Sequence, residues 1–232
     1  MLGVWANPIL VIVGAIAGTL LKGGIPERFR KILMQGLGLC VALIGISGAI
    51  ETANVLVVIL SIVAGAIIGE ALRIEERLNR FGDWAQAKMA RPGDTGFGQG
   101  FVSATLLFCV GSMAVVGSLE AGLSNNPDTL LAKTALDGVT SVVFASTMGI
   151  GVAFSAIPLL LYQGGIALLA GVVGPLLSEA VIVEMSATGS LLILGLGLNM
   201  LEVTGDKPIK VGNLLPAIFM PIALLPLVEL LF

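Results

Sequence analysis

Two stretches of apolar sequence carry the residues best suited to binding chemistry, because each combines glycines with hydroxyl side chains. The first reads FCVGSMAVVGS over 108–118, and the second reads DGVTSVVFASTMGIGV over 137–152. A helix that glycines interrupt inside a membrane frees carbonyls, N–H groups and hydroxyls that bind a solute or an ion. Close packing of helices favours the same small residues. The sequence therefore leaves two interpretations open, a binding site and a packing interface.

Asp137 is the acidic residue placed furthest inside an apolar run, where a charge is costly and usually functional. It follows Lys133 by four residues, so an ion pair within one helix near the outer interface is one interpretation. A site for a solute or a coupling ion, or an outer gate, is the other. Gln163 and Asn199 either line a path or bond between helices. The candidate solute-binding residues are Cys109, Gly111, Ser112, Asp137, Ser141, Ser146, Thr147, Gly149, Gly151, Gln163 and Asn199.

Composition excludes several chemistries. The chain has no histidine, and Cys40 and Cys109 lie in different apolar runs, so we expect no metal site and no cofactor. We also expect no enzymatic activity, because no nucleophile with a base, carboxylate pair or metal cluster is apparent. No GxxxxGK(S/T) loop marks a nucleotide-driven pump. The expected partners are the lipid bilayer and a small solute or ion, without nucleic acid, and association into a homo-oligomer stays open.

The elements that position these residues are predicted to be membrane-spanning helices. Of the 232 residues, 56% are hydrophobic and only 12% are charged, whereas about a quarter are charged in a typical soluble domain. Runs of about 20 apolar residues cross the hydrocarbon core as helix. Eight such runs are predicted, at 8–21, 32–50, 54–71, 100–117, 134–155, 159–176, 187–201 and 213–231. The sequence thus predicts an all-α polytopic membrane protein, with a break between the fifth and sixth runs near Pro158.

The basic residues predict the orientation of this bundle. With eight spans, every Lys and Arg except Lys133 falls on one face, which the positive-inside rule makes cytoplasmic. Both termini are then expected outside, in the periplasm of a bacterial inner membrane. The first run lacks a basic leader and a cleavage pattern, so we interpret it as an uncleaved span. The polar segment 73–98 is expected to form a helix on the cytoplasmic membrane surface.

An internal repeat is suggested by two copies of Gly-Leu-Gly-Leu, at 36–39 and 195–198, each followed at the same distance by an asparagine. Both pairs are offset by 159 residues, and Asn54 and Asn213 are expected to cap helices. With a short gap, 14–21 aligns with 170–177 and Asn7 with Gln163. Spans one to three would then match spans six to eight in inverted orientation. The predicted domain comprises residues 1–232, with repeats at about 6–72 and 159–231 and central spans at 99–155.

Three segments together resemble a known family. They are FCVGSMAVVGS, then LDGVTSVVFASTMGIGVAFSAI with the following YQGG, and LLILGLGLNML with the following KVGNLLPA. The combination is similar to bacterial inner-membrane proteins of unknown function, the YqgA/YdfK-like family, along nearly the whole chain. The resemblance implies a prokaryotic plasma-membrane protein and supplies no activity.

The function expected from these patterns is secondary transport by alternating access. No Lys or Arg is expected near mid-membrane, so the solute is expected to be small and neutral, zwitterionic or cationic. Na⁺ is the favoured coupling ion, because oxygens bind it without a titrating acid. Replacing Gly149 or Gly151 by Leu is expected to block uptake without unfolding the protein. A channel, or a subunit of a larger membrane assembly, is the alternative.

Overall fold

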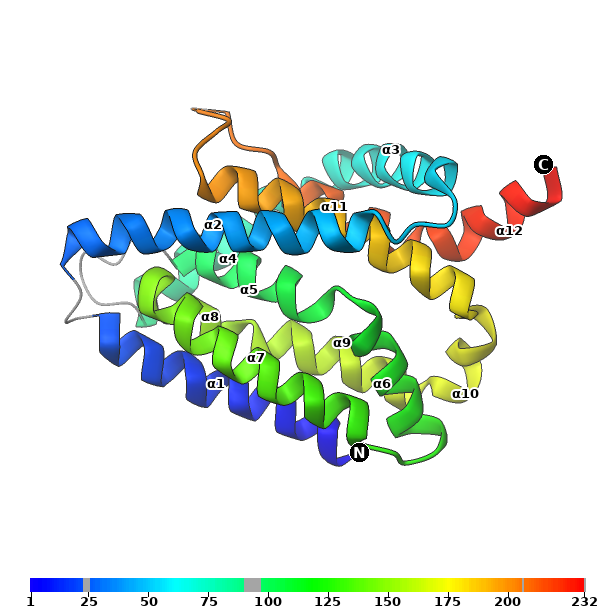
Figure 1. Ribbon diagram of the computed structural model, residues 1–232, viewed down its shortest axis with the longest axis horizontal. Helices are drawn as coiled ribbons and strands as arrows, with labels where there is room; N and C mark the ends of the chain where they lie inside the picture. Colours follow the sequence, from blue (N-terminus) through cyan, green and yellow to red (C-terminus); the bar gives the residue numbers. More distant parts are fainter. Residues whose placement is uncertain (23–25, 90–96, 206, 232) are drawn as a thin grey trace. The chain divides into compact units, whose positions relative to one another are not determined.

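The computed structural model describes residues 1–22, 26–89, 97–205 and 207–231, and all secondary structure in them is helical. Each of the eight predicted apolar runs corresponds to one, two or three helical segments (Figure 1). The helices are α1 (Leu2–Lys22), α2 (Glu27–Ala49), α3 (Val55–Leu72), α4 (Ile74–Met89), α5 (Phe97–Cys109), α6 (Ser112–Leu123), α7 (Asp128–Met148), α8 (Gly151–Phe154), α9 (Ala156–Leu168), α10 (Ala170–Val173), η1 (Gly174–Leu176), α11 (Glu179–Met200), η2 (Val211–Phe219) and α12 (Pro221–Leu231).

The chain packs as two compact units, each assembled from separate segments of sequence. The first unit comprises Met1–Met34, Leu78–Cys109 and Met113–Val173. The second comprises Gln35–Arg77, Val110–Ser112 and Gly174–Phe232. The units therefore interleave along the sequence.

In the first unit, α1 and α7 run side by side in the same direction (Figure 1). Gly14 and Gly18 of α1, one turn apart, lie against the backbone of α7 at Gly138 and Val142. In return, Leu10 of α1 covers Gly138. Small residues at this spacing allow two helix backbones to approach closely, which is the main source of helix association in lipid.

Two glycines with positive φ interrupt the central helices. Gly111 (φ 114°) lies between α5 and α6, which bend by 62°, and Gly149 (φ 87°) ends α7. Such backbone conformations are accessible to glycine and costly for other residues. The chain therefore breaks at 149–150, inside the predicted fifth run, and a second helix boundary at Ser155, between α8 and α9, lies close to the break predicted near Pro158. Pro158 lies in the first turn of α9, where its missing N–H costs no helix hydrogen bond.

In the second unit, α2 and α11 run antiparallel. Gly38 packs on Leu201, and Gly197 packs on the backbone of Ala42. α3 and η2 are also antiparallel, with Gly65 against Ala217. η2 is a 3₁₀ helix of nine residues that meets α12 at a bend of 56°. Because 3₁₀ helices rarely exceed four residues, this last run is broken in a way that the sequence prediction missed.

The polar segment predicted at 73–98 begins with a helix. Arg73 adopts a left-handed conformation that ends α3, and α4 follows at once. The helical prediction is confirmed over Ile74–Met89, while residues 90–96 lie outside the described residues. The side chain of Trp84 is exposed.

The helices carry the composition of membrane spans. Within the described residues, five are long and apolar enough to cross a membrane, or seven if each bent pair forms one span. α7, which holds most of the predicted run 134–155, is not among these seven, and it carries Asp128, Lys133 and Asp137. Large apolar side chains such as Ile59, Val63 and Ile67 are exposed. The polar residues that are buried include Asn7, Ser61, Ser103, Ser118, Lys133, Thr134, Asp137, Ser141, Thr147, Ser155, Gln163, Glu184, Thr188, Ser190 and Asn213. Exposed apolar side chains together with buried polar side chains are the pattern of a helical protein that faces lipid.

The α1–α7 contact can be tested at Gly18. A Cβ atom there would overlap the Val142 carbonyl, so Gly18→Leu must separate the two helices. Overpacking of this kind costs about 1–3 kcal/mol. We expect the purified variant to unfold at a lower temperature than the wild type. The matched control is Gly36→Leu on α2, where an added Cβ meets nothing within 4 Å. Equal unfolding temperatures for the two variants would contradict the packing.

Candidate functional site

A buried ion pair lies in the first unit, between Lys133 and Asp137 of α7. The Lys133 Nζ is 2.9 Å from the Asp137 carboxylate, and each side chain is 8% exposed. Asp137 lies close to the midpoint of α7, where Leu10 of α1 covers the neighbouring Gly138. The ion pair predicted from the four-residue spacing is therefore present.

Two amide side chains extend this pair into a polar cluster. Asn7 of α1 donates from Nδ2 to the Asp137 Oδ2 at 2.9 Å, and also to the Gln163 Oε1 of α9 at 3.5 Å. Both amide residues are completely buried. We call Asn7, Lys133, Asp137 and Gln163 the polar cluster. Three helices that are far apart in sequence thus bring two charges and two amides together.

Asp137 fixes the orientation of both amides. A carboxylate only accepts hydrogen bonds, so Asn7 must turn its NH₂ group toward Asp137. Gln163 must then turn its oxygen toward the same NH₂ group. This leaves the Asn7 Oδ1 and the Gln163 Nε2 without a hydrogen-bond partner among the described residues. Such buried unpaired groups are rare in folded proteins and cost about 1–3 kcal/mol each.

A hydrophobic layer beside the cluster holds the helices in register. Val4 of α1, Leu130 of α7 and Ala167 of α9 pack together with Ala121 of α6, and all four are buried. Each of the first three lies about one turn from the cluster residue on its own helix: Asn7, Lys133 or Gln163. Their packing therefore positions the polar side chains above them.

Cys109 is partly buried and is the last residue of α5, immediately before the bend at Gly111. Among the residues predicted from sequence, the hydrogen bonds of the cluster group Asp137 with Gln163.

The predicted hydroxyl residues of α7 do not join the cluster through a hydrogen bond. Ser141, Ser146 and Thr147 each donate to the carbonyl three residues earlier in α7, at 2.7–2.9 Å. Ser141 also lies against Gly14 in the α1–α7 contact. These bonds satisfy the hydroxyl donors within their own helix.

Gly149 and Gly151 serve the fold. Gly149 allows the left-handed turn after α7, and a Cβ on Gly151 would overlap the Phe97 carbonyl. Leucine at either position would therefore distort the first unit. This corrects the expectation that such variants stay folded, because the backbone at Gly151 faces protein rather than an open path.

The remaining predicted residues belong to the second unit. Gly111 and Ser112 lie at the bend before α6, next to Val110, which packs on Gly189 of α11. Asn199 binds the backbone of the loop after α11. Its side chain donates to the Ile209 carbonyl at 2.8 Å and accepts from the Ile209 N–H at 2.9 Å. The structure therefore gives Asn199 a loop-holding role and does not group it with the polar cluster.

Comparison with known proteins identifies the family of this chain. Residues 2–226 match a family described as "Protein of unknown function (DUF554)". The chain belongs to the DUF554 family. It is 34% identical over 226 residues to "Uncharacterized membrane protein YdfK" of Bacillus subtilis (strain 168), covering 95% of this chain and 94% of the relative. It is 32% identical over 228 residues to "Uncharacterized protein YqgA" of Escherichia coli (strain K12), covering 97% and 96%. No solved structure gives a significant match.

The family resemblance inferred from the sequence is thus confirmed, and this DUF554 chain is a membrane protein. Neither relative's name specifies a substrate or an activity. Its chemistry must therefore be argued from the residues themselves.

Sequence reasoning missed one fully buried acid, Glu184 of α11. Its carboxylate accepts from the Thr52 hydroxyl at 2.6 Å and from the N–H groups of Ala53 and Asn54 at 2.8 and 2.9 Å. Asn54 then caps α3, as predicted. Glu184 escaped notice because α11 begins at Glu179, before the apolar run predicted from 187. A signal was available, since Ser178 precedes the helix as an N-cap.

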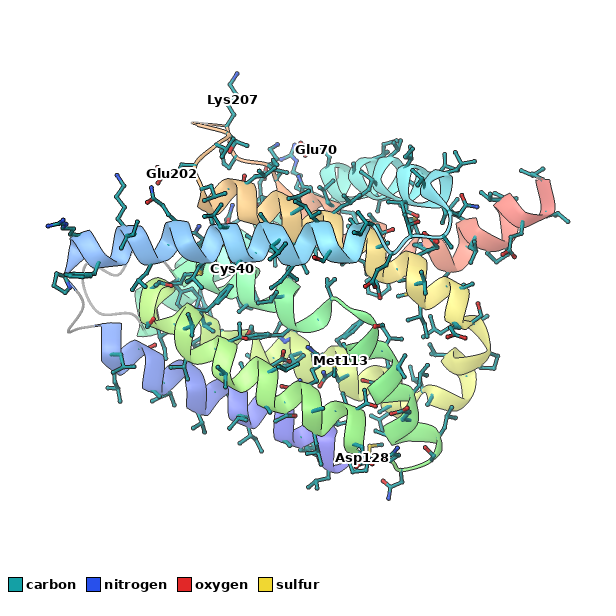
Figure 2. The ribbon with its side chains drawn as sticks, viewed as in Figure 1. Cys40, Glu70, Met113, Asp128, Glu202 and Lys207 are labelled. Carbon is teal, nitrogen blue, oxygen red and sulfur yellow. The ribbon has the colours of Figure 1, made fainter. Side chains whose placement is uncertain are left out.

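Two further carboxylates, those of Glu70 and Glu75, bind the chain that follows the loop after α11. Glu70 accepts from Asn213 at 2.6 Å and pairs with Lys210 at 3.1 Å. Glu75 accepts from the Gly212 N–H, while the Asn213 Oδ1 accepts from the Glu75 N–H. Asn213 thus caps α4 rather than its own helix, which corrects the prediction. Figure 2 marks Glu70 at the end of α3, and Glu202 and Lys207 on the loop after α11.

The ion pair can be tested by removing its partners singly and together. Lys133→Met leaves the Asp137 carboxylate buried without a counter-charge, which costs about 3–5 kcal/mol, whereas an apolar replacement of both partners is often neutral. We expect the double variant Lys133→Met, Asp137→Leu to unfold at a higher temperature than Lys133→Met alone. If the single variant is as stable as the wild type, the two charges are not buried together.

Proposed function

We propose that this DUF554 chain is a secondary transporter and that the polar cluster is its solute site. The observation that carries the proposal is the ion pair inside the first unit, joined to two amides with unpaired atoms. A buried ion pair is seldom more stabilising than apolar residues of similar volume, so stability alone does not account for it. Ionisable residues inside membrane bundles usually mark a path for a substrate or an ion.

An inverted repeat of spans one to three and six to eight is part of the proposal. Residues paired by the sequence alignment meet in space: Asn7 contacts Gln163, and Gly38 and Gly197 both lie on the antiparallel contact of α2 with α11. The N–H groups of Ala53 and Gly212, also 159 residues apart, each donate to a glutamate. The alignment of 14–21 with 170–177 has less support, because the first lies within α1 and the second spans α10 and η1.

The buried Asp137 carboxylate bears on the coupling ion. An acid inside a membrane bundle can serve either Na⁺ or a proton, so both ions belong to the proposal. Transport is favoured over catalysis, because the cluster pairs its acid with an ammonium and amides rather than with a nucleophile.

Counterflow into proteoliposomes tests the proposal. Vesicles loaded with unlabelled glycine, urea or methylamine represent the zwitterionic, neutral and cationic classes. We expect labelled solute of at least one class to accumulate transiently, as a carrier requires, and the double variant Lys133→Met, Asp137→Leu to abolish it. The assay is run with a Na⁺ gradient and with a proton gradient. Flux without a transient overshoot would favour a channel, and no flux of any probe would contradict transport.

Labelling in intact cells tests the proposed orientation, with both termini outside and α4 in the cytoplasm. In a variant without Cys40 and Cys109, a cysteine at the exposed Leu230 of α12 should react with an impermeant maleimide. A cysteine at the exposed Arg77 of α4 should react only after the cells are opened. The opposite pattern would overturn the orientation, and equal labelling of both positions would overturn the span count.

A further inference from the structure

The polar cluster offers four kinds of binding group, and their signs limit what can occupy it. Lys133 supplies an ammonium and Asp137 a carboxylate, held 2.9 Å apart. Asn7 supplies an unpaired acceptor, Oδ1, and Gln163 an unpaired donor, Nε2. Because Asp137 fixes the orientation of both amides, these signs follow from the charge pair.

Each class of small solute satisfies a different subset of these groups. A cation is attracted by Asp137 and the Asn7 Oδ1, but it is repelled by Lys133 and leaves the Gln163 Nε2 unpaired. An anion is attracted by Lys133 and the Gln163 Nε2, but it is repelled by Asp137 and leaves the Asn7 Oδ1 unpaired. A neutral amide can pair with both open amide atoms, yet it makes no use of the two charges. A zwitterion matches all four groups, since its carboxylate accepts from Lys133 and Gln163 while its ammonium donates to Asp137 and Asn7.

Charge balance favours the same class. The empty cluster is neutral because Lys133 and Asp137 pair with each other. A zwitterion exchanges one internal ion pair for two external ones and leaves the net charge unchanged. In a low-dielectric bundle, a net charge would be costly. Lys133 and Asp137 thus neutralise each other when no solute is bound, as the solute's two charges would when it is bound.

The contacts also limit the size of the solute. The four side chains touch one another through hydrogen bonds of 2.9–3.5 Å, so a solute must part them. The two protein charges come from adjacent turns of α7, which suits a solute whose ammonium and carboxylate are separated by few bonds. The Asn7 Oδ1 calls for an N–H donor, which a quaternary ammonium lacks.

We infer that the polar cluster recognises a small zwitterion with a primary ammonium close to its carboxylate, of the α-amino-acid type. The solute opens the Lys133–Asp137 pair and replaces each partner. This inference rests on the proposed function for its site, and it adds the substrate class.

Binding to the purified full-length protein tests the inference without requiring transport. Glycine is compared with methylamine, acetate, acetamide and glycine betaine by the rise in unfolding temperature and by equilibrium dialysis. We expect glycine to bind at least about tenfold more tightly than each analogue, because every analogue leaves buried groups unpaired. Equal or tighter binding of any analogue, or no binding of glycine, would overturn the inference.

Single-charge variants make the test specific to the ion pair. Lys133→Met should shift the preference from glycine to methylamine, because Asp137 then lacks a cation. Asp137→Asn should shift it toward acetate, because Lys133 then lacks an anion. A pair with a purely structural role would lose stability in both variants without this exchange of ligand preference, which would contradict the inference.

Gln163→Leu covers the case in which the charge variants do not fold. It removes the Nε2 donor and keeps the ion pair, and we expect glycine binding to fall at least about tenfold. The matched control is Gln99→Leu at an exposed position of α5, which should bind glycine as the wild type does. Unchanged binding by Gln163→Leu would count against the inference.

The two proposals fail in different ways. Glycine binding without counterflow of glycine, urea or methylamine would refute transport and keep the zwitterion site. Counterflow of urea or methylamine without glycine binding would keep transport and refute the zwitterion.

Discussion

The ion pair between Lys133 and Asp137 is the constraint that orients the other polar groups of the cluster in the first unit. Inside a lipid-embedded bundle neither charge is tolerable alone, so each holds the other in place. The carboxylate then orients Asn7, and Asn7 orients Gln163, which links α1, α7 and α9 through one network. The same network leaves one acceptor and one donor unpaired. A single pair of charges therefore determines both how the amides are oriented and which of their atoms stay unpaired.

Small residues make this arrangement possible. Gly14 and Gly18 bring α1 against α7, so the short Asn7 side chain reaches Asp137 directly. In the second unit, glycines of α2 and α11 allow an equally close contact, and Glu184 holds the α2–α3 loop with three hydrogen bonds. The hydrophobic effect contributes little to helix association in lipid. Close packing and buried hydrogen bonds therefore stabilise the helix contacts in both units.

Much of the helical architecture could be predicted from the sequence, because apolar runs, caps and glycines act locally. The apolar runs that form helices, the Asn54 cap and the four-residue spacing of Lys133 and Asp137 are of this kind. Helix ends were less accurate: α11 begins earlier than its apolar run because buried Glu184 is satisfied by a distant loop.

The site required tertiary information. Gln163 was a candidate, but nothing local to it indicates that Asn7 and Asp137 lie beside it. Asn199 also has an amide side chain, but it binds the backbone of the loop after α11 instead. The composition of α7 indicated that its hydroxyls were ligands. In the structure these hydroxyls donate hydrogen bonds to carbonyls of α7 itself, as Ser and Thr commonly do in membrane helices.

The most direct measurement of the central claim is the separation of the Lys133 Nζ from the Asp137 carboxyl carbon in lipid bilayers, obtained by solid-state NMR dipolar recoupling. The protein carries ¹⁵N-labelled lysine and carboxyl-¹³C aspartate, with every lysine other than Lys133 replaced by arginine. The account predicts a distance of about 3.5 Å without solute, as expected for a paired ammonium and carboxylate, and loss of this coupling at saturating glycine. A coupling that is absent without solute, or that persists unchanged with glycine, would contradict it.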